Sequence, residues 1–165
     1  MTTPALHPDF SAFIASLMRH RVRFVVVGAH ALAALGRARM TDDLDVLVEP
    51  SADNARRVAE ALREFGGFVA LADQVLEYLA EPGRLVSLGR PPVSIDILTG
   101  LSGVTFDEAW AGRDEHAIDG HAVPFLGLAE MVRTKRAAGR TKDRLDLALL
   151  AEAGLIDEKE VLGEE

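Results

Sequence analysis

The spacing of apolar residues changes several times along the chain, and each change predicts a new element. From Asp9 to His20 the apolar positions recur every three to four residues, which predicts a helix packed on a core. The β-branched run at 22–27 and the apolar run at 43–48 predict two strands. Between them, an Ala/Leu-rich stretch that closes at Gly36 predicts a short helix.

The rest of the chain continues to alternate between helical and extended patterns. A helix capped by Ser51 is predicted to end at Gly66-Gly67, and a short capped helix to cover Thr105 to Ala111. Two C-terminal helices are predicted, broken at Gly139, with Thr141 capping the second. Further strands are expected at Phe68–Leu71, Leu76–Leu79, Leu85–Leu88, Val93–Leu98 (after a turn at Pro91-Pro92) and His121–Phe125.

We expect one domain over residues 1–165, with a core at about 22–126 and C-terminal helices at about 127–162. The sequence shows no repeat and no low-complexity linker. No apolar run approaches the ~20 residues of a transmembrane helix. The N-terminus lacks a basic region followed by a hydrophobic stretch. A cytoplasmic protein that does not contact membranes is therefore expected.

Composition narrows the classes of function. The formal net charge of −8 argues against a protein that coats nucleic acid generally, because many phosphate contacts require a basic surface. Aromatic residues make up 5% of the chain, which disfavours an extended surface for stacking bases. The absence of cysteine excludes disulfides and thiolate metal sites. The apolar content of 48% permits a homodimer without requiring one.

Carboxylates interrupt two of the predicted strands. Asp43 and Asp45 are two residues apart, so in an extended chain both side chains point to the same side of the sheet. Asp96 lies between Ile95 and Ile97 and points away from the face that these isoleucines occupy. Half-buried carboxylates repel one another unless a positive charge holds them, and Mg²⁺ is the usual ion. An isolated Asp-x-Asp is common, however, so the motif needs support from elsewhere.

The turn after the first predicted strand gives that support. Gly28-Ala29 joins a strand to a helix, so free backbone N–H groups at the helix start could bind a phosphate without hindrance from a Cβ. A tight strand-to-helix turn with no ligand explains the same residues. Together, the turn and the carboxylates favour phosphoryl or nucleotidyl transfer.

The combined pattern resembles the signature of DNA polymerase β-like nucleotidyltransferases. Val27-Gly28-Ala29 is followed by a thirteen-residue spacer (30 to 42), by Asp43-Leu44-Asp45, and by Asp96 on a later strand. The chain is more closely similar to the small bacterial AbiEii-like and minimal nucleotidyltransferases, which are often found in toxin–antitoxin pairs. That similarity spans about residues 22–150 and rests on segments 25–32, 41–46, 95–99 and 135–146.

The resemblance implies an α/β (α+β) nucleotidyltransferase fold, with a central mixed β-sheet flanked by helices and a C-terminal helical pair. It also implies that Asp43, Asp45 and Asp96 are catalytic carboxylates that bind Mg²⁺ or Mn²⁺, with a nucleoside triphosphate as substrate. Gly28 and Ala29 would contact the phosphates. Many family members carry Ser or a second Gly at the position of Ala29, so phosphate binding here would rely on backbone N–H groups.

Six of the chain's eighteen cations lie within twelve residues (133 to 144) of the C-terminal helices. A solvated helix face explains this cluster as readily as a cleft wall that neutralises a triphosphate or an RNA end. The resemblance favours Lys135 as a phosphate contact, with Arg140 as a second. Asp143 and Asp146 are three apart and could pair with Arg140 or Lys142, and we interpret both as organising the cleft.

The predicted activity is transfer of a nucleoside monophosphate from a triphosphate to a hydroxyl on a tRNA end or a protein, in a toxin–antitoxin setting with a cognate partner. Two alternatives remain open. Ala29 and the short chain favour a non-catalytic antitoxin or interaction module with the same fold. The acidic charge is compatible with a small-molecule (antibiotic) nucleotidyltransferase, whereas the basic C-terminal cluster suits an anionic acceptor.

Overall fold

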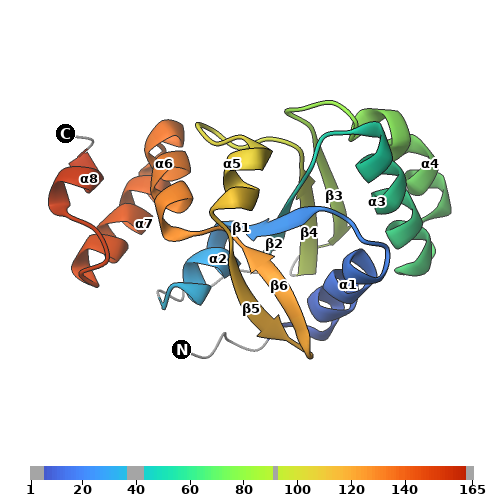
Figure 1. Ribbon diagram of the computed structural model, residues 1–165, viewed down its shortest axis with the longest axis horizontal. Coiled ribbons are helices and arrows are strands. Elements are labelled where there is room, and N and C mark those ends of the chain that lie inside the picture. Colours follow the sequence, from blue (N-terminus) through green and yellow to red (C-terminus); the bar gives the residue numbers. More distant parts are fainter. Residues whose placement is uncertain (1–5, 37–42, 91–92, 163–165) are drawn as a thin grey trace.

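The computed structural model describes residues 6–36, 43–90 and 93–162. The Thr41-Asp42 part of the carboxylate motif and the turn predicted at Pro91-Pro92 lie outside the described residues. Figure 1 shows a central sheet with helices gathered at both ends of the molecule. In the part of the chain that is described, no helix is both long and apolar enough to cross a bilayer.

The described strands form one mixed six-stranded sheet in the order β3-β4-β2-β1-β6-β5. Strand β2 lies inside the sheet, antiparallel to β1 on one side and parallel to β4 on the other. Strand β6 runs parallel to β1, and the outer strands β3 and β5 pair antiparallel with β4 and β6. The bounds are β1 (Phe24–Val27), β2 (Asp43–Val48), β3 (Leu85–Arg90), β4 (Val93–Leu98), β5 (Asp114–Ile118) and β6 (His121–Phe125).

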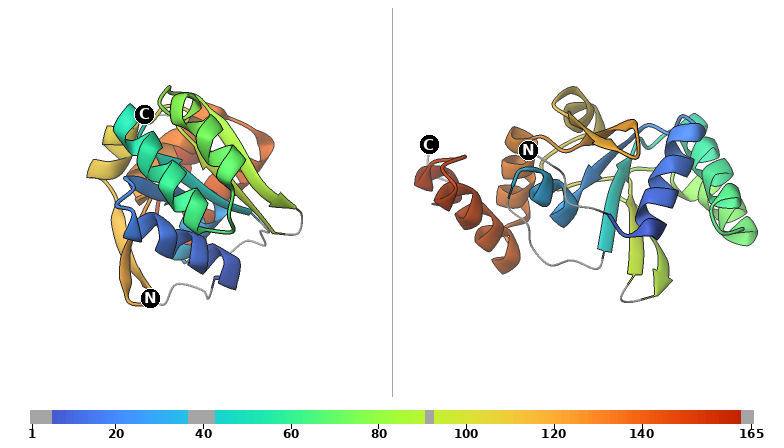
Figure 2. Two further views of the ribbon diagram at one scale, coloured as in Figure 1. Left: turned by 90° about the vertical axis from the view of Figure 1, so that its right-hand side faces the viewer. Right: turned by 90° about the horizontal axis from the view of Figure 1, so that it is seen from below.

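Six of the eight described helices lie at the two ends of the molecule, while α2 and α5 lie near its middle (Figure 1). Helices α1, α3 and α4 pack together at one end, and α6, α7 and α8 lie at the other, as Figures 1 and 2 show from three directions. This matches the predicted sheet with flanking helices and a C-terminal helical pair, to which α8 adds a short third helix. The bounds are α1 (Pro8–Arg19), α2 (Gly28–Ala34), α3 (Ala52–Glu64), α4 (Val69–Tyr78), α5 (Phe106–Ala111), α6 (Leu128–Ala138), α7 (Thr141–Glu152) and α8 (Glu158–Leu162).

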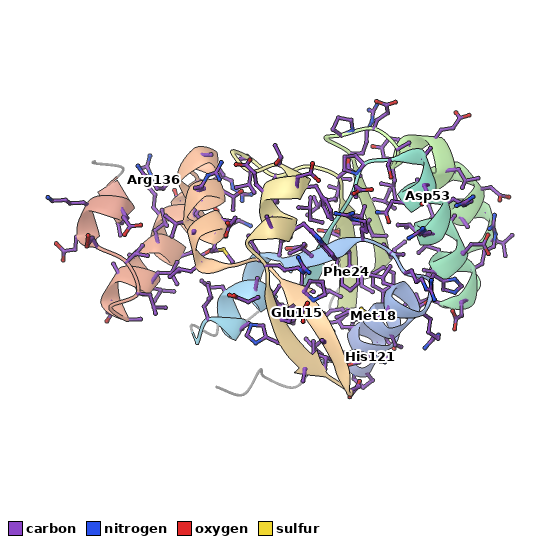
Figure 3. All side chains as sticks on the ribbon, viewed as in Figure 1. Met18, Phe24, Asp53, Glu115, His121 and Arg136 are labelled. Atoms are coloured by element: carbon purple, nitrogen blue, oxygen red, sulfur yellow. The ribbon has the colours of Figure 1, made fainter. Side chains whose placement is uncertain are left out.

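The core follows from the predicted apolar pattern. Strand β1 is buried along its whole length, because both its faces are covered. Phe24, at the start of β1, is 1% exposed and lies in the middle of the molecule in Figure 3. Phe13 from α1 packs edge-on against Phe65 at a centroid distance of 5.2 Å, which joins α1 to the end of α3. A single hydrophobic cluster links these elements to α6 and α7.

Several predicted helix ends are confirmed by their capping contacts. Ser51 Oγ accepts a hydrogen bond from the N–H of Asn54 at 3.1 Å, so Ser51 is the N-cap of α3. Thr105 Oγ1 accepts from the N–H of Glu108 at 3.1 Å, and Glu108 Oε1 accepts from the N–H of Thr105 at 3.0 Å. Gly139 ends α6 with φ of +62°, a conformation that glycine adopts at little cost.

The prediction of strands at Phe68–Leu71 and Leu76–Leu79 is wrong, because this segment forms helix α4. Ala72, Val75 and Leu79 are buried, at the i, i+3, i+7 spacing of a helical face, and they lie against α3. Two short apolar runs separated by polar residues therefore belong to one amphipathic helix. The prediction of strand 85–88 holds, with β3 extending to Arg90.

Two further differences concern polar residues. Strand β5 was not predicted, because Asp114–Ile118 is an outer strand with no buried residue and no apolar alternation. Helix α7 is preceded by Arg140 as N-cap, with Thr141 as its first helical residue rather than its cap. The N–H of Arg140 donates to Asp143 Oδ2 at 3.1 Å, and this carboxylate takes the place of the hydroxyl cap that the sequence suggests.

Candidate active site

The three predicted carboxylates lie on one face of two neighbouring strands. The register of the parallel strands β2 and β4 places Asp45 beside Asp96 and Asp43 beside Ser94. Leu44 and Ile95, one residue away along each strand, are buried on the opposite face. The structure therefore brings Asp43, Asp45 and Asp96 together as the alternation of the sequence predicts.

Two serine hydroxyls bind the outer carboxylates. Ser87 Oγ, on β3, donates to Asp96 Oδ1 at 2.6 Å, and Ser94 Oγ, on β4, donates to Asp43 Oδ1. Sequence reasoning missed the roles of both serines. Ser94 could have been found, because it stands two residues before Asp96 and so shares its face. Ser87 could not, because its position depends on the pairing of β3 with β4.

Asp45 is the carboxylate with the least favourable surroundings. Partial burial raises its pKa first, and the charges of Asp96 and Asp43 raise it further, so the pKa of Asp45 reaches about 6. A hydrogen bond between the Asp45 and Asp96 side chains acts in the same direction, while the positive charge of Lys142 opposes it. The site thus concentrates negative charge where water only partly screens it.

Gly28 lies directly against Asp45. It begins α2 with φ of +68°, and a Cβ built on it would collide with Asp45 Oδ2. Ala29, the next residue, is 7% exposed. The strand-to-helix turn predicted as a phosphate site therefore lies beside the carboxylates. Because Gly28 has no Cβ, the Asp45 side chain can occupy the space next to this turn.

A cleft of about 910 Å³ connects these groups with the C-terminal helices. One wall is the carboxylate face of β2 and β4 with the β1–α2 turn, and the other is formed by α6 and the start of α7. All seven predicted site residues line it. They are Gly28, Ala29, Asp43, Asp45, Asp96, Lys135 and Arg140.

Lys135 is held by a buried ion-pair network between α6 and α7. Its Nζ lies 2.9 Å from Asp146 Oδ2 and 3.4 Å from Asp143 Oδ1, and all three side chains are at most 8% exposed. Arg140 Nε and Nη2 donate to the two oxygens of Asp143 at 2.7 and 3.2 Å. Although burial alone raises the pKa of Asp143, these hydrogen bonds and the charge of Lys135 outweigh it and hold the pKa below its ordinary value.

The predicted cation cluster is split between two surfaces. Lys135, Arg140 and Lys142 line the carboxylate cleft. A second groove of about 540 Å³, on the outer side of α6 and α7, is lined by Arg133, Arg136, Arg144 and the other side of Lys135. Figure 3 shows Arg136 on α6, at the end of the molecule where the C-terminal helices gather. Helical periodicity thus sends neighbouring cations to different surfaces.

The carboxylates fit a hard divalent ion that a substrate helps to bind. Among the described residues, no group of three or more His, Asp or Glu side chains forms a metal site by itself. Mg²⁺ usually takes only one or two protein carboxylates and completes its shell with water and substrate phosphates. Partial burial and the neighbouring carboxylates raise the pKa of Asp45, so a cation bound beside it would favour its charged form. Asp45 and Asp96, with Asp43 beside them, are the residues that would hold such an ion.

The mixed sheet, with its carboxylates on adjacent parallel strands and helices at both ends, has the nucleotidyltransferase fold. A crystal structure from Thermotoga maritima, of a protein described as a "putative nucleotidyltransferase", superposes with a TM-score of 0.54. The match covers 87% of this chain and 91% of that chain at 15% sequence identity, so the likeness establishes the fold. No protein-family model and no curated protein matches the chain.

Proposed function

We propose that the protein is a metal-dependent nucleotidyltransferase that moves a nucleoside monophosphate from a triphosphate to a hydroxyl acceptor. The observation that carries this proposal is the convergence of Asp43, Asp45 and Asp96 on one cleft wall, where partial burial and then like charge raise the pKa of Asp45 to about 6. Such a cleft favours a ligand that brings cations and phosphates together.

The chain's own residues position and neutralise the reactants. The acceptor oxygen forms a bond to the α-phosphorus, the bond to the β-phosphate oxygen breaks, and pyrophosphate leaves. Asp96 favours loss of the acceptor proton, and the N–H groups of Gly28 and Ala29 face the phosphates. Arg140 and Lys135 line the opposite wall, where their positive charge acts on the phosphates at longer range. When bound by these carboxylates, Mg²⁺ or Mn²⁺ supplies electrophilic activation of the phosphate and stabilises the leaving pyrophosphate.

The setting we propose is that of the AbiEii-like and minimal nucleotidyltransferases: a cytoplasmic protein of a toxin–antitoxin pair with a tRNA end or a protein as acceptor. The basic groove beside the cleft supports an anionic acceptor over a cationic antibiotic, because Arg136 and Arg144 are exposed there in an otherwise acidic chain. A small cationic acceptor would instead require an acidic surface at the entrance to the cleft.

A second candidate is a non-catalytic interaction module with the same fold. It is favoured by Ala29, which has no hydroxyl to offer a phosphate, and by Lys135, whose charge is compensated by Asp143 and Asp146. Under this reading the protein binds a cognate partner tightly and turns over no nucleotide.

The deciding experiment incubates the protein with each of four α-³²P-labelled nucleoside triphosphates, Mg²⁺ or Mn²⁺, bacterial RNA and lysate protein. We expect label on an RNA or protein band, with activity reduced by several orders of magnitude in Asp45→Asn and Asp96→Asn. Asp53→Asn is the matched control, since Asp53 is an exposed carboxylate on α3, far from the cleft (Figure 3). Absence of label with every donor, from a folded protein, would favour the non-catalytic module.

A further inference from the structure

Among the described residues, three cations line the cleft, and two of them have their charge compensated by carboxylates. Lys135 Nζ is buried between Asp143 and Asp146. Arg140, although 61% exposed, directs its guanidinium at both oxygens of Asp143. Lys135 cannot turn to a phosphate without leaving buried carboxylates without their shared cation, which is costly, and Arg140 would have to give up both of its hydrogen bonds to Asp143.

Lys142 differs from both. It is exposed at the edge of the cleft, and among the described residues it makes no ion pair within 4.0 Å. It lies in the first turn of the twelve-residue helix α7, where the helix dipole adds partial positive charge. Lys142 lines the carboxylate cleft and not the outer groove, and its positive charge opposes the rise in the pKa of Asp45.

The chemistry of this side chain suits phosphate. A lysine ammonium is a compact charge on a flexible stem, which can follow a phosphate group over several ångströms. The cleft separates Lys142 from the carboxylates and leaves room for a ligand between them. A ligand that matches both walls has negative charge on the side of α7 and bound cations on the side of β2 and β4. A triphosphate with a bound divalent ion has this distribution of charge.

We propose that Lys142 is the cleft residue that binds the terminal phosphates of the incoming nucleotide, while Lys135 and Arg140 hold the wall on which it stands. This inference rests on the proposed function, because it names a binding residue for the same substrate. It assigns the direct contact to an exposed member of the cation cluster, whereas the resemblance favoured Lys135 and Arg140.

Arg144 provides a matched control. It lies two residues further along the same helix and is also exposed, but it lines the outer groove. Lys142→Ala and Arg144→Ala therefore remove the same charge from the same helix, on opposite sides. Lys142→Arg keeps the charge with a different shape. We expect all three variants to melt within a few degrees of the wild type, because surface substitutions of this kind change stability by about 0.5 kcal/mol or less.

The test measures binding of inorganic tripolyphosphate and of each of the four nucleoside triphosphates by calorimetry, with Mg²⁺ present. We expect Lys142→Ala to weaken binding at least about tenfold, Lys142→Arg to retain most of it, and Arg144→Ala to change it by less than about twofold. With a labelled acceptor, Lys142→Ala should raise KM for the triphosphate more than it lowers kcat.

Two other results are possible, and they separate the two proposals. If the wild type binds and Lys142→Ala behaves like Arg144→Ala, the role of Lys142 is wrong while the nucleotidyltransferase proposal stands. If the folded wild type binds neither tripolyphosphate nor any nucleotide, both proposals are wrong.

Discussion

The backbone of Gly28 and the carboxylate of Asp45 adjoin so closely that a Cβ on Gly28 would overlap Asp45 Oδ2. The contact joins the β1–α2 turn to the middle of β2, because Val27 and Asp45 are partners in the antiparallel ladder. Two features therefore require glycine at position 28. Its φ of +68° is unfavourable for residues with a Cβ, and the Asp45 carboxylate fills the space that a Cβ would need.

Gly28→Ala should therefore impair activity more than folding. A Cβ forces the Asp45 side chain to move, and displacement of a reacting group by about 1 Å can cost on the order of 100-fold in rate. The control is Gly67→Ala, since Gly67 has the same φ of +68° but no atom within 4 Å of its Cβ position. We expect both variants to lose about 1 kcal/mol of unfolding free energy and only Gly28→Ala to lose activity. Equal activities in a labelling assay would contradict this.

Asp45→Asn should stabilise the metal-free protein at neutral pH. The pKa of Asp45 is about 6 in the folded state and close to the ordinary 3.8 in the unfolded state. Between these two pH values the folded state therefore binds more protons than the unfolded state. The unfolding free energy therefore falls as pH rises through this window, by about 3 kcal/mol. Asn has no proton to lose and avoids this fall.

Urea denaturation in EDTA checks the sign. At pH 7.5, Asp45→Asn should be the more stable protein, and its advantage should shrink toward pH 4.5. Asp53→Asn, at an exposed position on α3, is the matched comparison. An advantage of Asp45→Asn that is the same at both pH values would show that the substitution acts through packing and not through ionisation.

Lys135→Met should destabilise the fold strongly. It leaves the buried carboxylates of Asp143 and Asp146 without their shared cation, and breaking a buried pair from one side costs about 3–5 kcal/mol. Arg136→Met is the adjacent control on the exposed face of α6, with an expected change of about 0.5 kcal/mol or less. Urea midpoints measure both. If the two midpoints agree, the network contributes little to stability.

Ser87→Ala should weaken binding of the divalent ion without unfolding the protein. Ser87 is exposed on an outer strand, and its hydroxyl fixes Asp96 Oδ1 at 2.6 Å. Loss of a hydrogen bond to a metal ligand typically costs about 10–100-fold in affinity or activity. Titration with Mn²⁺ in the presence of tripolyphosphate measures the effect. Ser87→Thr keeps the hydroxyl and suits a strand, so it should restore binding.

The carboxylate wall was predictable from the sequence because its evidence is local. Strand alternation alone places Asp43 and Asp45 on one face, and Asp96 opposite its flanking isoleucines. The caps at Ser51 and Thr105 are equally local. Helix α4 was mistaken for strands because an apolar run of four residues is too short to distinguish helical from strand periodicity. The apolar face of α4 becomes recognisable only when all ten of its residues are considered together.

The opposite wall was less predictable because it depends on how α6 packs on α7. The sequence suggested that Asp143 and Asp146 pair with Arg140 or Lys142, their neighbours along one helix. The structure confirms the Arg140–Asp143 pair, but it also pairs both carboxylates with Lys135 from the preceding helix, which the spacing did not suggest. Which cation is buried and which stays exposed is decided by contacts between helices, and no spacing along one helix reveals it.

Because negative charge is crowded around Asp45, binding of the nucleotide donor can be detected from the thermal stability of the protein itself. A ligand that brings positive charge to this wall relieves the repulsion between the carboxylates. Such a ligand binds the folded chain and not the unfolded one, so it raises the melting temperature. At a ligand concentration of 100 times Kd the gain is about 2.7 kcal/mol, enough to see by dye-based melting. A panel of nucleotides with Mg²⁺ could therefore be ranked by melting temperature before any acceptor is known.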